Sequence, residues 1–183
     1  MKPSVYVAFL RGINVGGSAV ISMDALKRAL AAIGLGQVQT VVASGNVVFE
    51  TVGKDSAVLA TKVERQLFET FDINITVVLR TAQEIRSFIR SNPFQQIKVT
   101  PQTRLQVSFL APDAKLRPNV LAALGGADFK LWPVQGTQIC SAFDASGTRG
   151  TTQLMKLLEK EFGKRITTRT WNTIERIGKL VDL

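Results

Sequence analysis

Apolar and polar positions along the first half of the chain follow helical and extended patterns in turn, which predicts an ordered series of strands and helices. The apolar run at residues 5–10 predicts a buried strand, and Ser22 can cap a helix that ends near residue 33. Thr81 and Glu84 have the spacing of a capping box for a later helix. The predicted elements are strands at residues 5–10, 38–43, 47–49 and 73–79, with helices at residues 23–33, 57–71 and 82–90.

The same order of elements recurs in the second half. Two prolines and a run of polar residues interrupt the patterns at residues 92–102, which predicts a linker between a first half at residues 1–91 and a second half at residues 103–183. The second half predicts strands at residues 105–110, 128–134, 138–143 and 165–168, with helices at residues 114–124, 152–162 and 171–181.

Internal matches indicate a duplication. Arg80-Thr81 recurs 89 residues later as Arg169-Thr170, whereas residues 8–10 recur 100 residues later as residues 108–110. The first half therefore holds 11 additional residues between its first strand and its first helix, and these coincide with a glycine-rich loop. Because the second copy lacks this insertion, we expect the loop to have a role beyond folding.

This order of elements predicts an α+β fold of two ferredoxin-like βαββαβ subdomains in tandem, each followed by an extra helix. Residues 5–10 are apolar on both faces, so we expect that strand to be buried on both sides. Other strands carry polar residues on one face, and there we expect contact with water. These polar positions are Asn74, Thr76, Gln106 and Ser108.

Composition narrows the classes of function. The 183 residues are 45% apolar, and their net charge of +9 favours partners that carry phosphate, among which nucleic acid is the weaker expectation. The chain has no histidine and a single cysteine, Cys140, so we expect no metal site and no internal disulfide. Because no apolar run is long enough for a signal peptide or a membrane span, we expect a cytoplasmic protein.

The glycine-rich loop is the leading candidate site. It contains Arg11, Gly12, Asn14, Gly16 and Gly17, between a predicted strand and a predicted helix. Glycines let backbone N–H groups approach an anion closely, and an arginine adds positive charge. The spacing departs from both the Walker A loop and the dinucleotide fingerprint, so only a general capacity for anion binding is predicted. The alternative is a tight structural loop with Arg11 paired to a carboxylate.

Two further segments are candidates for the same site. Ser44, Gly45 and Asn46 form a hairpin signature, and neighbouring strand ends could bring them to the glycine-rich loop. A late helix begins near Arg169, Trp171 and Asn172, where Asn172 and Glu175 have capping-box spacing. Trp171 either anchors that helix or stacks on a ligand, and both interpretations remain open.

Catalytic groups are sparse. Without histidine no Ser-His-Asp or Cys-His arrangement can form, and Cys140 lies in an alternating pattern that predicts a buried thiol. The carboxylates show no acid–base pairing. The sequence therefore leaves enzyme activity, catalytic residues and cofactor undecided.

Three motifs together resemble the bacterial family known as domain of unknown function 1697. They are Arg-Gly-Ile-Asn-Val-Gly-Gly at residues 11–17, Ser-Gly-Asn-Val-Val-Phe at residues 44–49, and Arg-Thr-Trp-Asn-Thr at residues 169–173. The resemblance implies a duplicated ferredoxin-like fold and no established activity, substrate or cofactor. The chain departs from the family's usual pattern at residues 18–20, 42–43 and 170, so a ligand held by polar groups there would bind differently.

The leading hypothesis is therefore a cytoplasmic protein that binds a small anionic or nucleotide-like ligand at residues 11–17. One alternative is RNA binding on a sheet face, with Tyr6 stacking on a base, although the basic aromatic partner strand is missing. Another alternative is a structural or interaction module without a ligand. We expect such a module to tolerate Asn14→Ala, since its loop would serve the fold alone.

Overall fold

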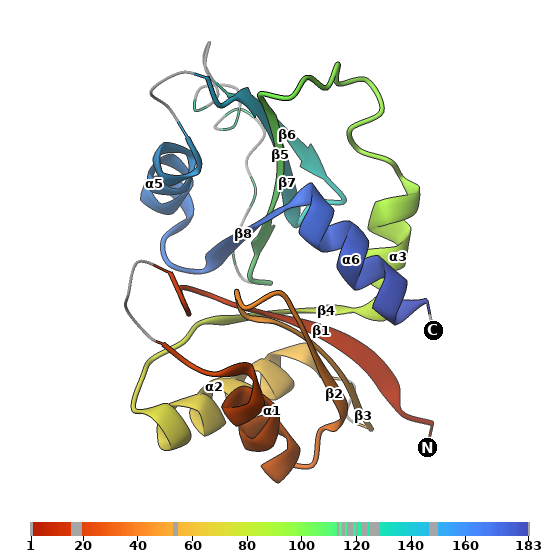
Figure 1. Ribbon diagram of the computed structural model, residues 1–183, viewed down its shortest axis with the longest axis vertical. Helices are drawn as coiled ribbons and strands as arrows, with labels where there is room; N and C mark the ends of the chain where they lie inside the picture. The colour runs from red at the N-terminus through yellow and green to blue at the C-terminus, as the bar shows by residue number, and fades with distance from the viewer. Residues whose placement is uncertain are drawn as a thin grey trace. The chain divides into compact units, whose positions relative to one another are not determined.

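The two halves of the chain form two four-stranded antiparallel sheets with equivalent strand orders, β2-β3-β1-β4 and β6-β7-β5-β8 (Figure 1). The computed structural model describes residues 2–15, 20–52, 55–112, 114, 116, 119, 121, 124, 129–146 and 150–182. This arrangement confirms the predicted α+β fold of two tandem subdomains.

The first half follows the predicted order closely. Its strands are β1 (Ser4–Leu10), β2 (Gly36–Val41), β3 (Asn46–Thr51) and β4 (Val77–Thr81). Its helices are α1 (Met23–Ala32), α2 (Ser56–Phe71) and α3 (Ala82–Arg90). Ser22 caps α1 through a hydrogen bond from Ala25 N to Ser22 Oγ, as predicted.

The second half repeats this order. Its strands are β5 (Thr103–Leu110), β6 (Lys130–Val134), β7 (Gln138–Asp144) and β8 (Ile166–Thr170). Its helices are α5 (Thr151–Phe162) and α6 (Trp171–Val181). The helix predicted at residues 114–124 falls largely outside the described residues. The repeat is therefore not compared over that helix.

The repeat is visible in the strand registers. Leu10 of β1 lies opposite Val77 of β4, and Leu110 of β5 lies opposite Ile166 of β8. Val7 lies opposite Arg80, and Val107 lies opposite Arg169. These pairs are related by the same two offsets, 100 and 89 residues, that the sequence contains.

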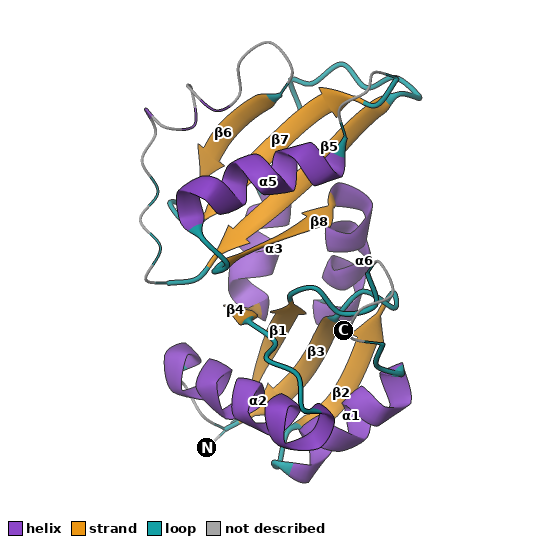
Figure 2. Cartoon of the chain, turned by 90° about the vertical axis from the view of Figure 1, so that its left-hand side faces the viewer, coloured by secondary structure: helices purple, strands orange, loops and turns teal. Residues whose placement is uncertain are grey.

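By contacts between residues, the chain divides into two units, and the division falls within α3 and α6. Unit 1 comprises Met1–Ser87 and Glu175–Leu183, and unit 2 comprises Phe88–Ile174. In unit 1, α1 and α2 cover one face of the sheet and share a core with Tyr6, Ala8 and Leu10 of β1 (Figure 2). In unit 2, α5 covers one face and packs its Leu154 and Leu158 into the core (Figure 2). The boundary predicted at residues 92–102 stays a prediction.

The structure confirms that β1 is buried on both faces, because Val7 and Phe9 are as inaccessible to solvent as Ala8 and Leu10. The prediction that Gln106 and Ser108 face water is wrong, since both side chains are buried. Gln106 Nε2 donates to Thr151 Oγ1 at 2.6 Å, and the Ser108 and Thr168 hydroxyls lie 2.6 Å apart. Hydrogen bonds within the unit thus take the place of water at Gln106 Nε2 and at the Ser108 hydroxyl.

Strand β4 begins at Val77, four residues later than predicted. Its partner β1 ends at Leu10, which lies opposite Val77, so residues before Val77 have no length of β1 to pair with. The beginning of β4 is instead held from the side, where Val77 N donates to Glu64 Oε1 at 2.8 Å. The position of this strand end is therefore set by its neighbour.

The capping box predicted for α3 is confirmed. Thr81 N donates to Glu84 Oε2 at 2.7 Å, and Glu84 N donates to Thr81 Oγ1 at 3.1 Å. The box predicted from Asn172 and Glu175 is wrong, because α6 already begins at Trp171. Thr170 caps this helix, and its Oγ1 accepts from Thr173 N at 3.3 Å.

This assignment can be tested by two alanine substitutions. We expect Thr170→Ala to lower the free energy of unfolding by about 1 kcal/mol, since it removes the cap. Asn172 is exposed, so Asn172→Ala should change the free energy by no more than about 0.5 kcal/mol. Urea unfolding measures both values, and a larger loss for Asn172→Ala would contradict the assignment.

Candidate functional site

The glycine-rich loop begins at the end of β1, where two backbone hydrogen bonds fix its first residues. Leu10 N donates to Gly45 O at 2.7 Å, and Arg11 N donates to Thr76 O at 2.9 Å. The loop therefore starts between the β2–β3 turn and the segment that leads into β4. The predicted meeting of this loop with Ser44, Gly45 and Asn46 is thus present in the geometry of unit 1.

Asn14 ties the loop to its surroundings through its whole carboxamide. Its Nδ2 donates to Ile21 O and to Ala43 O, each at 2.9 Å, and its Oδ1 accepts from Ile21 N at 2.8 Å. Its backbone is in the left-handed region, with φ of 55°, which asparagine tolerates better than most residues. The Asn14 side chain thus holds the loop in place. Tolerance of Asn14→Ala by a purely structural loop stays a prediction, which the hydrogen bonds argue against.

Gly12 and Asn14 both have positive φ, 70° and 55°, whereas Ile13 between them does not. Alternation of this kind turns successive N–H groups toward one side of the chain, as in anion-binding nests. Ile13 is buried and anchors the turn in the core, while Gly12 is exposed. The remaining predicted residues of this loop, Gly16 and Gly17, lie outside the described residues.

Ser44 and Asn46 are engaged within their own hairpin. Asn46 is fully buried, and its Nδ2 donates to Val41 O at 2.9 Å and to Ser44 Oγ at 3.1 Å. Gly45 has φ of 74°, and a Cβ there would lie 2.9 Å from Leu10 O. The three residues shape the turn that holds the glycine-rich loop, and any role of theirs in ligand binding stays a prediction.

One residue with a strained backbone and three exposed valines lie in or next to the segments that contact the glycine-rich loop. Val42, in the β2–β3 turn, has φ of 57°, a conformation that is rare for a β-branched residue and that recurs at functional sites. Val15, Val20 and Val42 are 60%, 78% and 48% exposed, and each is next in sequence to Asn14 or to a residue that Asn14 contacts. The sequence carried no sign of these features, because a valine is not expected in the left-handed region.

Arg169, the first residue of the late motif, belongs to unit 2 and has a counterpart in unit 1, Arg80. Each guanidinium folds back so that Nη1 donates to the preceding carbonyl, Leu79 O at 2.7 Å and Thr168 O at 2.8 Å. Burial lowers the pKa of both guanidinium groups, that of Arg169 to about 10. Because both repeats have this arrangement, it suits a structural role.

Trp171 lies among aromatic residues of unit 2. Its ring centroid is 5.9 Å from that of Phe88 and 5.1 Å from that of Phe94, in edge-to-face geometry. These contacts support the interpretation of Trp171 as an anchor for α6, while Asn172 is exposed at the same helix end. The assignment of Arg169, Trp171 and Asn172 to a ligand site stays a prediction.

The RNA-binding alternative relied on Tyr6, and the structure removes that basis. Tyr6 is only 2% exposed and belongs to the core of unit 1, where its ring stacks on Phe49 with centroids 6.1 Å apart. A residue in this position cannot stack on a base. Cys140 is also buried, as predicted, and burial raises the pKa of its thiol to about 12.

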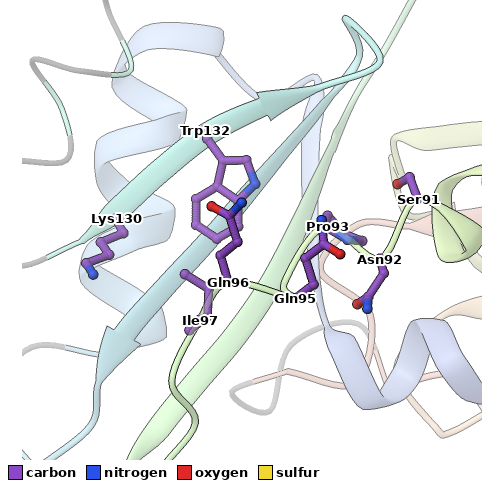
Figure 3. Close-up of a pocket in the computed structure, with 8 residues that line it drawn as sticks. All are labelled: Ser91, Asn92, Pro93, Gln95, Gln96, Ile97, Lys130 and Trp132. Atoms are coloured by element: carbon purple, nitrogen blue, oxygen red, sulfur yellow. The ribbon is translucent and has the colours of Figure 1, made fainter.

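A pocket of about 310 Å³ lies in unit 2, and sequence reasoning did not find it (Figure 3). The residues that follow α3 form one wall, and β6 supplies Lys130 and Trp132. The polar character and the prolines of residues 92–102 predict a linker there, which gives no indication of a pocket wall. The sequence feature that indicates this pocket is the pair Lys130 and Trp132, which lie two residues apart on a predicted strand and therefore on the same face of it.

The described helices include none with both the length and the apolar character needed to cross a bilayer. Within the same residues, no three metal-ligating side chains of the His, Cys, Asp or Glu type come together. Neither observation identifies a reaction.

The fold places the chain among α+β proteins with two four-stranded antiparallel sheets of equivalent strand order. The family model described as "Protein of unknown function (DUF1697)" matches residues 4–139, so the chain belongs to that family. The predicted resemblance is thereby confirmed.

Among solved structures, the chain is similar to the conserved bacterial protein SP0830 from Streptococcus pneumoniae, with a TM-score of 0.72 and 21% identity over 98% of this chain and 99% of that one. This likeness shows a common fold. An unknown protein from Galdieria sulphuraria aligns with a TM-score of 0.27 and 16% identity over 92% of this chain and 98% of that one. A comparison with curated proteins found no match.

Proposed function

We propose that the protein binds a small anionic ligand of the nucleotide or organic phosphate type at the loop formed by Arg11, Gly12, Ile13 and Asn14. The observation that carries the proposal is the alternation of φ sign at Gly12, Ile13 and Asn14, which directs successive N–H groups to one side. Within the described residues, the contacts of the loop include no acceptor for these three N–H groups. Arg11 adds positive charge at the start of the loop.

The three hydrogen bonds of the Asn14 side chain, here called the Asn14 clamp, support the proposal because they fix the loop before any ligand binds. A site that is already ordered loses little conformational entropy on binding. Hydrogen bonds of the Asn14 side chain with the backbone of Ile21 and Ala43 hold one end of the turn, and the contact from Leu10 N to Gly45 O holds the residue before Arg11. The loop is thus restrained on both sides of Gly12 and Ile13.

The exposed valines indicate the kind of anion. Val15, Val20 and Val42 offer apolar surface next to residues that fix the loop, so a ligand with an organic group gains contacts that inorganic phosphate lacks. We therefore expect phenyl phosphate to bind more tightly than inorganic phosphate. The family and the fold are consistent with this proposal and assign no ligand.

A pair of nearly isosteric substitutions at Gly12 tests the site. A Cβ at Gly12 would meet no atom within 4 Å, and both Asp and Asn tolerate positive φ, so both variants should fold. We expect Gly12→Asp to weaken phenyl phosphate binding at least about tenfold relative to Gly12→Asn, because it adds a negative charge beside the anion. Calorimetric titration measures both affinities. Equal affinities would contradict the proposal.

A further inference from the structure

The pocket of unit 2 lies beside β6, which among the described strands is at the edge of its sheet and pairs with β7 (Figure 3). Residues 91–97 form the opposite wall. Its volume of about 310 Å³ is at the lower end of the range for small-ligand sites. The side chains that matter below are Asn92, Gln95, Gln96, Lys130 and Trp132.

The wall formed by residues 91–97 is an ordered series of turns. Gln95 N donates to Asn92 O at 3.1 Å, and Ile97 N donates to Phe94 O at 2.9 Å. Phe94 is buried below it, with its ring centroid 5.4 Å from that of Trp132 and 5.1 Å from that of Trp171. These contacts fix the indole of Trp132 and hold the wall to the sheet before a ligand is present.

The chemistry of the lining is specific. Lys130 and Trp132 are two residues apart on β6, so their side chains lie on the same face of the sheet. Carboxamides of Asn92, Gln95 and Gln96 line the facing wall, and no carboxylate is among the lining residues that the structure describes. The site thus offers an aromatic ring, amide donors and acceptors, and one positive charge.

We propose that this pocket binds a nucleoside monophosphate unit, either as a free nucleotide or within a single strand. A base can stack on the indole, as bases do on exposed aromatic side chains of single-strand binding proteins. Glutamine and asparagine amides can pair with the hydrogen-bonding edge of the base, and Lys130 can neutralise the phosphate. This inference concerns unit 2 and does not depend on the function proposed for the loop of unit 1.

Calorimetric titration of the full chain with adenosine 5′-monophosphate (AMP) tests the proposal, with ribose 5-phosphate and adenosine as partial ligands. We expect AMP to bind more tightly than either partial ligand. Trp132→Leu should weaken AMP binding about tenfold or more, since it removes stacking. Lys130→Gln should weaken AMP binding about fivefold and leave adenosine binding unchanged.

Two controls keep the result interpretable. Lys156→Gln removes an exposed lysine of α5 outside the pocket, and it should leave AMP affinity within about twofold of the wild-type value. Trp132→Phe retains an aromatic ring, so it should preserve most of the affinity even if Trp132→Leu destabilises the wall. Thermal melts verify that each variant is folded.

Each outcome bears on the proposal. A hexanucleotide of adenylate that binds more tightly than AMP indicates a single strand, and equal or weaker binding indicates a free nucleotide. No binding of AMP at millimolar concentration would overturn the inference, as would equal affinity for ribose 5-phosphate. Binding that is unaffected in the Lys130 and Trp132 variants but lost in Gly12→Asp would overturn it as well, and would leave the function proposed for unit 1 standing.

Discussion

Gly45→Ala is expected to lower the free energy of unfolding by about 3 kcal/mol, since a non-glycine residue with positive φ costs about 1 kcal/mol and overpacking adds about 1–3 kcal/mol. The added Cβ would lie 2.9 Å from Leu10 O, Leu10 Cβ and Ile13 Cγ1, at a residue with φ of 74°. Leu10 O belongs to the backbone of β1 and cannot move without disturbing the strand. For a domain of this size the loss corresponds to a fall in melting temperature of about 6–12 °C, measured by calorimetry.

Gly136 provides a matched control in the second repeat. It lies in the β6–β7 turn with φ of 73°, and a Cβ there would meet no atom within 4 Å. Gly136→Ala should therefore cost only the conformational part, about 1 kcal/mol. If the two substitutions had the same effect, close packing of the β2–β3 turn against β1 would not be what makes Gly45 necessary.

Asn14→Ala is expected to lower the free energy of unfolding by about 3 kcal/mol. The substitution removes three hydrogen bonds at about 1 kcal/mol each and leaves the Ile21 backbone without its partners. Alanine also tolerates the φ of 55° less well than asparagine. Urea unfolding monitored by far-ultraviolet circular dichroism gives the value.

Asn14→Gly separates the two causes. Glycine accepts positive φ without cost, so this variant loses the hydrogen bonds but not the backbone compatibility. We expect it to be destabilised about 1 kcal/mol less than Asn14→Ala. A loss below about 0.5 kcal/mol in both variants would show that the amide does not hold the loop.

Periodicity, together with capping and turn residues, was sufficient to predict most of the fold. The helix expected at residues 82–90 has those bounds in the structure, and the last helix was placed at residues 171–181 as observed. The beginning of β4 could not be predicted, because it is set by the end of β1 in a different part of the chain. Gln106 and Ser108 were placed in water because their hydrogen-bond partners, Thr151 and Thr168, lie 45 and 60 residues away in sequence.

The candidate site was less predictable. Residue types identified Asn14 and Asn46 as hydrogen-bonding groups, but which groups they bond depends on the packing of two loops. The strained backbone of Val42 has no sequence signal, because the conformation is imposed by the hairpin. The pocket beside Trp132 depends on the turns of residues 92–97, which composition alone indicated as a linker.

The two repeats show what distinguishes the first. Leu10 N donates to Gly45 O in unit 1, and Leu110 N donates to Thr137 O at 3.0 Å in unit 2, so both repeats join the end of the first strand to the hairpin turn. The insertion after Leu10 therefore adds to a connection that the fold already has. In the described part of unit 1 the addition comprises the Asn14 clamp and the turn at Gly12 and Ile13.

The claim that this loop binds an anion through its backbone N–H groups is tested most directly by nuclear magnetic resonance. The measurement is a titration of ¹⁵N-labelled protein with phenyl phosphate at low ionic strength, followed by amide chemical shifts. We predict saturable shifts that are largest at the N–H groups of Gly12, Ile13 and Asn14, and that disappear in Gly12→Asp but persist in Gly12→Asn. Shifts that are spread over the basic surface and do not saturate, with these three N–H groups unaffected, would contradict the account.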